Sequence, residues 1–136
     1  MKKTKVNHRE AVVKRLADLK SCYILDAATG GANMAKMLSS NLNAYIISVD
    51  IDREVAEDIY EIVDKQKVQF VLCDLASMPF RNGAFCCIVC DLTLSTIENW
   101  RHYRALKEFK RTPKARSKLY IMDYPPEESP RANEIN

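Results

Sequence analysis

The stretch Ile24-Leu25-Asp26-Ala27-Ala28-Thr29-Gly30-Gly31-Ala32 decides the fold of this chain. Apolar residues at 23–25 predict a buried strand, which ends on the carboxylate of Asp26. The small residues after it predict a loop, and the pattern over residues 32–40 predicts a helix. Small residues let the backbone approach a ligand, and a helix N-terminus offers free N–H groups. This corner is therefore typical of ligand-binding loops in doubly wound α/β sheets.

Strand and helix patterns alternate along the rest of the chain. The predicted strands lie at residues 23–26, 44–49, 68–73, 84–90 and 118–122. A capping box of Asn7 and Glu10 opens a helix over about residues 8–20, and Asp52 caps another after the second strand. Short apolar strands joined by helices predict an α/β fold with three layers. We expect a Rossmann-like, mostly parallel sheet of about five strands with helices on both faces.

The last helical segment has both a predicted apolar side and a basic bias. A capping box of Ser95 and Glu98 opens it, and Thr112-Pro113 ends it. We expect its apolar residues to line one side of the helix: Trp100, Tyr103, Leu106 and Phe109. Residues 101–118 carry eight basic side chains against only Glu108. Such a segment is either a solvated helix face and loop or a contact for an anion or RNA.

Composition places the chain among ordinary globular domains. Its 136 residues suffice for one domain with its own core, and 47% of them are hydrophobic and 29% charged. No apolar run approaches membrane-spanning length, and no signal-peptide core follows the N-terminal Met1-Lys2-Lys3-Thr4-Lys5. We expect a cytoplasmic protein without a membrane segment, with one domain over residues 1–124 and a loose tail over residues 125–136.

Four aspartates stand at the ends of consecutive predicted strands: Asp26, Asp50, Asp74 and Asp91. The carboxyl ends of parallel strands form one edge of an open α/β sheet, where ligands bind, so we expect these side chains to gather there. Asp50 can accept hydrogen bonds from both hydroxyls of a ribose. Asp74 can accept one from the exocyclic amine of adenine, with Leu75 as an apolar contact to the ring. Asp26 can orient the loop or meet an ammonium group.

A dinucleotide is the competing ligand for this corner. Its G-x-G-x-x-G fingerprint closes the turn so that the pyrophosphate sits on the helix N-terminus. Here Gly30 and Gly31 are adjacent, and Asp26 stands at the strand end. A carboxylate at that place repels pyrophosphate and suits a cationic amino-acid ligand, so the sequence disfavours NAD.

Four segments resemble the class I methyltransferases that depend on S-adenosylmethionine (SAM). Leu25 to Ala32 resembles their acidic, glycine-rich SAM loop, and Ser48-Val49-Asp50-Ile51 resembles their ribose-binding motif. Residues 73–80 and 82–85 resemble the adenine-binding segment and the following strand, in the form found in the subgroup that methylates small molecules such as quinones and sterols. Residues 105–111 resemble the helix before the fifth strand.

This resemblance covers about residues 8–124 and implies a SAM-dependent methyltransferase with a small-molecule acceptor. The residues implied to bind the cofactor are Asp26, Ala28, Thr29, Gly30, Asp50, Ile51, Asp74, Leu75 and Asp91. Methyl transfer from a sulfonium gains most from proximity and orientation, so no catalytic residue is assigned. Two other functions stay open: a non-catalytic SAM-binding subunit or scaffold of a split methyltransferase, and an RNA modifier that uses residues 101–118.

The sequence departs from the family pattern at two places. Ala28 and Ala32 replace glycines that are usual in the SAM loop, which either narrows the pocket or stiffens the loop. The family normally continues with two further strands, whereas this sequence stops soon after the fifth. An open edge strand is usually paired or covered, so we expect a homodimer or a partner subunit at the fifth strand.

Five cysteines raise the question of a metal or redox site, and most lie in apolar strand-like runs where a reduced thiol behaves as a small hydrophobe. Cys87 and Cys90 have the spacing of a metal or redox pair. On a strand, however, positions three apart point to opposite faces, so these two cannot chelate one ion. The sequence therefore predicts buried core thiols and no metal site.

Overall fold

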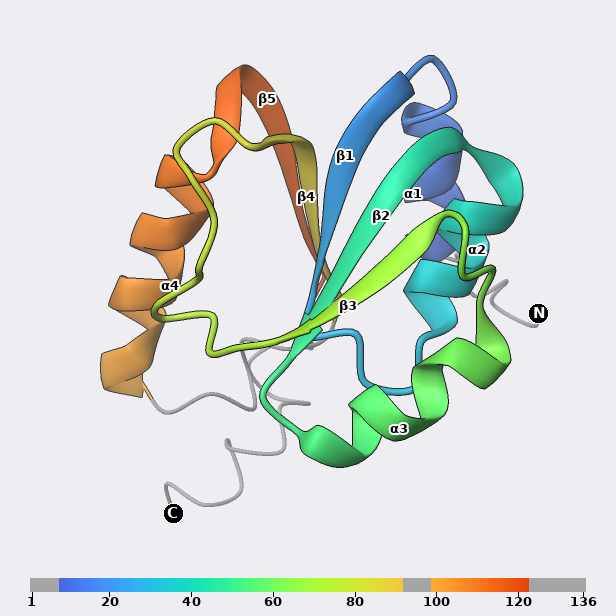
Figure 1. Ribbon diagram of the computed structural model, residues 1–136. Coiled ribbons are helices and arrows are strands. Elements are labelled where there is room, and N and C mark those ends of the chain that lie inside the picture. Colours follow the sequence, from blue (N-terminus) through green and yellow to red (C-terminus); the bar gives the residue numbers. More distant parts are fainter. Residues whose placement is uncertain (1–7, 92–98, 123–136) are drawn as a thin grey trace, which may run out of the picture.

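The computed structural model describes residues 8–91 and 99–122, which form one parallel sheet with helices on both sides (Figure 1). In chain order the elements are α1 (His8–Arg15), β1 (Lys20–Ala27), α2 (Asn33–Asn41), β2 (Asn43–Asp50), α3 (Arg53–Ile62), β3 (Val68–Leu72), β4 (Phe85–Asp91), α4 (Asn99–Arg111) and β5 (Pro113–Met122). The strand order is β3-β2-β1-β4-β5, and every pairing is parallel. The predicted Rossmann-like sheet is confirmed. None of the described helices is long and apolar enough to cross a membrane.

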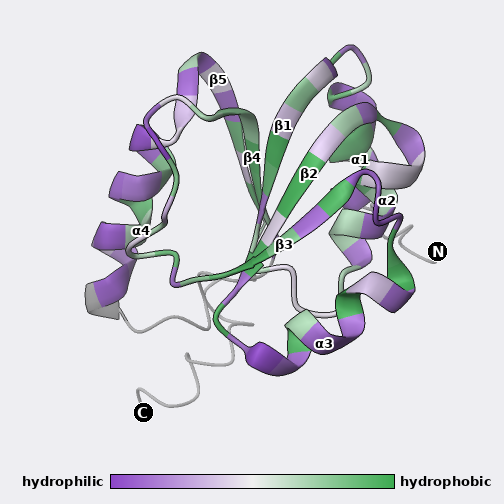
Figure 2. Cartoon of the chain, in the orientation of Figure 1, coloured by the Kyte–Doolittle hydropathy of each residue, from purple (hydrophilic) through white to green (hydrophobic). Residues whose placement is uncertain are grey.

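The two faces of the sheet bury separate sets of apolar side chains. Helices α1, α2 and α3 lie on one side of the sheet and α4 on the other (Figure 1). Ile24, Ile46 and Val68 lie side by side in register on β1, β2 and β3, and all three are fully buried under the first set of helices. Leu25 and Ile88 are paired on β1 and β4 and belong to the cluster under α4. Hydrophobic residues dominate the inner strand β4, which has burial on both faces, whereas the outer strand β5 carries several hydrophilic residues (Figure 2).

The helix starts agree only in part with the capping signals. Asp52 caps α3 as predicted, and its carboxylate accepts a hydrogen bond from Glu54 N at 2.9 Å. Helix α1 ends at Arg15, shorter than predicted, because turns over residues 16–18 lead into β1. Asn7 of the first predicted capping box, and both Ser95 and Glu98 of the second, lie outside the described residues.

The predicted apolar side of α4 is right at Phe109 and wrong at Tyr103 and Leu106, and the Trp100 side chain lies outside the described residues. Ala105 and Phe109 are buried under the helix, with exposed fractions of 1% and 2%, whereas Tyr103 is 65% exposed and Leu106 is 44% exposed. Positions 105 and 109 are one turn apart and share a face, and the small side chain of Ala105 lets the helix approach the sheet. The prediction took the larger apolar residues and overlooked the alanine.

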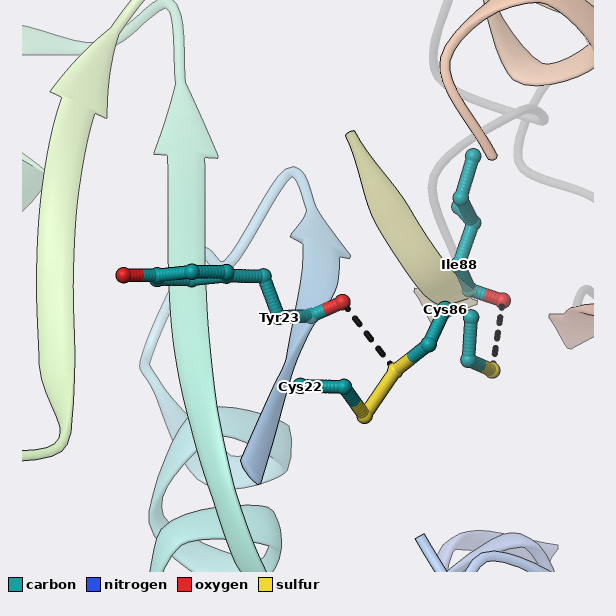
Figure 3. The surroundings of a disulfide bond; sticks show 5 residues. Cys22, Tyr23, Cys86 and Ile88 are labelled. Atoms are coloured by element: carbon teal, nitrogen blue, oxygen red, sulfur yellow. Dashed lines mark hydrogen bonds between the residues drawn. A yellow bond between two sulfur atoms is a disulfide. The ribbon is translucent and has the colours of Figure 1, made fainter. Parts of the chain in front are cut away.

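Two of the five cysteines form a disulfide, Cys22–Cys86, which joins the starts of β1 and β4 (Figure 3). Their Cα atoms are 6.1 Å apart, so the expectation of reduced core thiols is wrong for this pair. When the bridge is reduced, the Cys86 thiol can donate a hydrogen bond to Tyr23 O, which lies 3.2 Å from its sulfur. Cys87 and Cys90 are buried thiols on opposite faces of the sheet, as the strand geometry predicts.

Candidate functional site

The loop between β1 and α2 has the backbone of a glycine-rich turn although two of its residues are alanines. Ala28, Gly30 and Ala32 all have positive φ angles, of 58°, 50° and 65°. The left-handed region costs a residue with a Cβ roughly 1 kcal/mol or more, so the loop stores strain. Thr29 N donates to Val49 O at 2.9 Å, which fastens the loop to the end of β2. The alanines therefore leave the turn intact and add two methyl groups to it.

Asp50 connects this loop to the segments that follow β2 and β3. Its Oδ2 accepts a hydrogen bond from Gly30 N at 3.0 Å, and its Oδ1 accepts one from Asp52 N at 3.0 Å. The backbone oxygen of Asp50 accepts a bond from Cys73 N, also at 3.0 Å. Each carboxylate oxygen can accept a second hydrogen bond, so Asp50 retains the capacity to bind two hydroxyl groups.

Asp26 is a buried carboxylate that is only half satisfied. Its exposed fraction is 1%, and its Oδ2 accepts a hydrogen bond from the Ser48 hydroxyl at 2.9 Å. Its Oδ1 and the Thr29 Oγ1 are both buried, and neither has a hydrogen-bond partner among the described residues. Burial is the main cause that raises the pKa of Asp26 to about 6. Two hydroxyls oppose this rise in pKa: that of Thr29, which lies close to the carboxylate without hydrogen-bond geometry, and that of Ser48, which donates to it. The charges of Asp91 and Asp50 add to the rise.

The other two strand-end carboxylates are paired with arginines from two helices. Asp91 accepts a bond from Arg9 Nε of α1 at 2.6 Å, and Asp74 forms an ion pair with Arg101 of α4. Asp74 Oδ1 also accepts a hydrogen bond from Ala76 N at 2.9 Å. The strand directions bring all four carboxylates to one edge of the sheet, as predicted, but they divide into a pair that contacts the loop and a pair that contacts arginines.

A family model described as a methyltransferase domain matches residues 24–115, which include the loop and all four carboxylates. The chain belongs to this methyltransferase family. No curated protein sequence shows significant similarity to this chain. Among solved structures, the methyltransferase domain resembles a SAM-dependent methyltransferase from Aquifex aeolicus, with a TM-score of 0.76 and 22% identity over 89% of this chain and 66% of that one.

Two further structures show the same fold. The Haemonchus contortus phosphoethanolamine N-methyltransferase 2 in complex with SAM has a TM-score of 0.71 and 22% identity, over 85% of this chain and 27% of that one. A structure of the Haloferax volcanii Trm112 methyltransferase activator with a methyltransferase has a TM-score of 0.72 and 16% identity, over 84% of this chain and 50% of that one. The domain thus spans between about a quarter and two thirds of the length of these relatives. Its fold is that of the class I SAM-dependent methyltransferases.

The two apolar residues assigned to the cofactor of this methyltransferase domain lie in different surroundings. Ile51 follows β2 directly and is 64% exposed, so it stands at the open edge beside Asp50. Leu75 is 7% exposed and packs in the cluster under α4. A ligand can contact Ile51 directly, whereas it reaches only the outer surface of Leu75.

Polar partners of the site that the sequence did not reveal are mostly arginines. Arg9, Arg101 and Arg111 all form ion pairs with carboxylates, and the two from α4 belong to the basic segment 101–118. Arg111 pairs with Glu108 one turn earlier on α4. This i,i+3 spacing was the one local signal of such a pair, because the partners of Arg9 and Arg101 are distant in sequence.

Proposed function

We propose that this domain binds SAM at the carboxyl edge of β1 and β2 and transfers its methyl group to a small-molecule acceptor. The unpartnered Asp26 Oδ1 is the single observation that carries the proposal. A buried carboxylate oxygen without a donor is costly, and the ammonium group of an amino-acid ligand supplies the missing hydrogen bond. The residues present therefore fit the cofactor of the family.

Each assigned residue would hold one part of the cofactor. We assign Asp26 and Thr29 to the amino-acid portion and Asp50 to the ribose hydroxyls. Gly30 and Ala28 would let the loop backbone approach the amino-acid portion. Asp74, Leu75 and Ile51 are assigned to adenine, and Asp91 to the remaining side of the site. These assignments stay predictions.

Charge at this edge favours a cationic ligand. Asp26, Asp50 and Asp91 are close enough that the last two charges raise the pKa of the first. Bound SAM supplies a methyl group on a positively charged sulfonium. The domain contributes orientation and exclusion of water around the acceptor, which are the main requirements of methyl transfer.

A small-molecule acceptor is supported by the segment after β3 and by one relative. Residues 73–85 resemble the subgroup that methylates small molecules, and the Haemonchus contortus relative is by its name a phosphoethanolamine N-methyltransferase. RNA is a weaker alternative, because Arg101 and Arg111 of the basic segment are committed to Asp74 and Glu108. A non-catalytic SAM-binding subunit remains the second alternative, and the Haloferax volcanii structure with an activator is the precedent for a partner.

A homodimer or a partner subunit at β5 stays our proposal for the assembly. Strand β5 is an outer strand of the described sheet, with Lys114, Arg116 and Lys118 exposed along it. A symmetric contact between two copies would bring these like charges together, so salt would strengthen it. A contact with an acidic partner would weaken in salt. Sedimentation at low and high ionic strength distinguishes these two cases, and a monomer at both contradicts the homodimer.

We also propose a cytoplasmic location. The structure contains the bridged form of Cys22 and Cys86; in the cytoplasm glutathione would keep the same pair reduced until the protein meets an oxidant, whereas an oxidising compartment would preserve the bridge. Alkylation of thiols in intact cells, followed by mass spectrometry, measures the state of this pair. A fully oxidised pair would contradict the location.

Calorimetric titration with SAM tests the proposed cofactor. We expect micromolar binding that Asp50→Ala weakens by about 100-fold, because two charge-assisted hydrogen bonds to the ribose and the tether to Gly30 are lost. Asp58→Ala is the matched control, since Asp58 is exposed on α3. Absence of binding at millimolar SAM, in protein that is folded, would overturn the proposal.

A further inference from the structure

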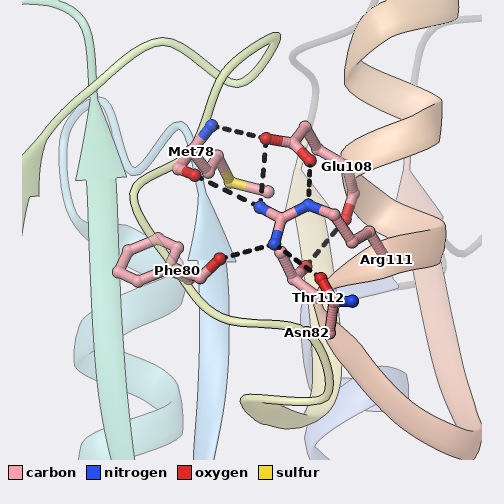
Figure 4. A network of polar contacts seen from close by, with 6 residues as sticks. All are labelled: Met78, Phe80, Asn82, Glu108, Arg111 and Thr112. Atoms are coloured by element: carbon pink, nitrogen blue, oxygen red, sulfur yellow. Dashed lines mark hydrogen bonds and ion pairs between the residues drawn. The ribbon is translucent and has the colours of Figure 1, made fainter.

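The last turn of α4 holds the segment that joins β3 to β4. Arg111 donates to the backbone oxygens of Phe80 at 2.6 Å and Met78 at 3.2 Å, and to Asn82 Oδ1 at 3.0 Å (Figure 4). Glu108 accepts from Met78 N at 2.7 Å and forms two further bonds with the Arg111 guanidinium. These contacts define the Glu108–Arg111 clamp.

The clamp replaces the backbone pairing that this segment would have in a strand or helix. Residues 78–83 have no regular secondary structure, and their backbone groups need other partners. Gly83 N donates to Arg111 O at 3.1 Å, so the helix backbone takes part as well. The hydrogen bond from Arg111 is the main cause that lowers the pKa of Glu108, which keeps the carboxylate charged and the clamp closed.

The clamped segment continues directly from the residues assigned to adenine. Asp74 and Leu75 precede it by three to four residues, and Leu75 and Met78 pack in one cluster with 7% and 5% exposure. At the near end, Arg101 of the same helix pairs with Asp74. Helix α4 thus contacts both ends of residues 74–83, and the packing of Met78 with Leu75 connects the clamp to the adenine segment.

We propose that Glu108 and Arg111 are positioning residues for adenine recognition, acting through Met78 on Asp74 and Leu75. The role rests on the proposed function, because it requires a bound adenine. It differs from a merely stabilising role in one respect. A clamp that positions Asp74 and Leu75 makes the protein bind a ligand with the adenine amine more tightly than one without it. A clamp that only stabilises the fold changes the affinity for both ligands equally.

The test compares two ligands in four variants by calorimetry. The ligands are S-adenosylhomocysteine and S-inosylhomocysteine, in which a carbonyl oxygen on C6 replaces the adenine amine and N1 carries a proton. The variants are Arg111→Met, Arg111→Lys, Glu108→Gln and the control Lys110→Met, which removes an exposed positive charge from the same helix. We expect Arg111→Met to weaken S-adenosylhomocysteine binding about tenfold and to reduce the preference for it by a similar factor. The affinities and preferences of Arg111→Lys and Glu108→Gln should fall between those of Arg111→Met and the wild type. Those of Lys110→Met should match the wild type.

Hydrogen exchange at the amide of Met78 gives a second readout that survives poor folding of Arg111→Met. In folded Arg111→Lys and Glu108→Gln, exchange should accelerate at Met78 and stay unchanged at Thr29 in the loop. Folded Arg111→Lys or Glu108→Gln protein that binds both ligands as the wild type does, or that loses affinity for both equally, contradicts the positioning role. Failure of the wild type to bind S-adenosylhomocysteine contradicts the proposed function itself.

Discussion

Two irregular segments border the carboxyl edge of the sheet, and they are held in opposite ways. The loop at residues 28–32 has left-handed alanines and adjoins two buried oxygens without partners. The segment at residues 78–83 has its backbone groups bonded by Glu108 and Arg111. Strain and unsatisfied polar atoms persist where a ligand completes the structure, whereas satisfied networks supply rigidity. This difference supports our proposal that the ligand binds at the loop and that the clamp provides rigid support.

The disulfide gives the largest expected effect. It joins the strand before the loop to the strand after the clamped segment, at the ends of β1 and β4 away from the carboxylates. The bridge closes a loop with a sequence separation of 64, so its reduction should lower the free energy of unfolding by about 4 kcal/mol. Urea denaturation with and without reductant measures this change.

The paired substitution Cys22→Ser with Cys86→Ser is the control for incidental effects of the reductant. It should reproduce the loss of stability and leave the affinity for SAM within about twofold, because the bridge lies far along the strands from the loop. A large loss of affinity in folded protein would show that the two ends of the sheet are coupled.

Substitutions in the clamp should mainly lower the free energy of unfolding, whereas substitution of Asp50 beside the loop should mainly lower the affinity for SAM. Arg111→Met removes the ion pair of the part-buried Glu108 carboxylate, which keeps its bond from Met78 N, and the Arg111 donors of two backbone oxygens. We therefore expect a loss of about 2 kcal/mol in the free energy of unfolding. Asp50→Ala removes only exposed contacts and should cost less than about 1 kcal/mol, although it weakens SAM binding far more. Urea denaturation measures the unfolding free energies of both variants, with Lys110→Met as the control. Equal losses in the two variants would contradict this difference between clamp and loop.

The loop alanines give the smallest expected effect. Ala28→Gly should raise stability by about 0.5–1 kcal/mol, because glycine adopts a positive φ without the steric cost of a Cβ. Ala32→Gly should change stability little, because Ala32 is 1% exposed and the lost burial of its methyl group offsets the released strain. Thermal unfolding of the two variants tests whether the loop is strained. A destabilised Ala28→Gly would show that it is not.

The sequence predicted those features that depend on local periodicity. The alternation of strands and helices, the Asp52 cap and the position of the four aspartates at strand ends all follow from patterns within a few residues. The buried face of α4 was mistaken because size was taken as the guide to burial, whereas Ala105 faces the sheet.

The contacts that the sequence did not reveal depend on the register of distant strands. Arg9 and Asp91 are 82 residues apart, and Cys22 and Cys86 are 64 apart. Both β1 and β4 have a register shift near these cysteines, at Lys20/Tyr23 and at Phe85/Cys87. Such irregularities decide which side chains meet, and no local pattern encodes them.

Proton release on SAM binding tests the central claim, that Asp26 meets the cationic part of the ligand. Burial raises the pKa of Asp26 to about 6, and a bound cation lowers it again, so binding near that pH should expel a proton. Calorimetric titrations in two buffers of different ionisation enthalpy should then give different heats near this pH and equal heats well above it. Asp26→Asn should abolish the difference in any residual binding. Binding with equal heats in both buffers near this pH would contradict the account.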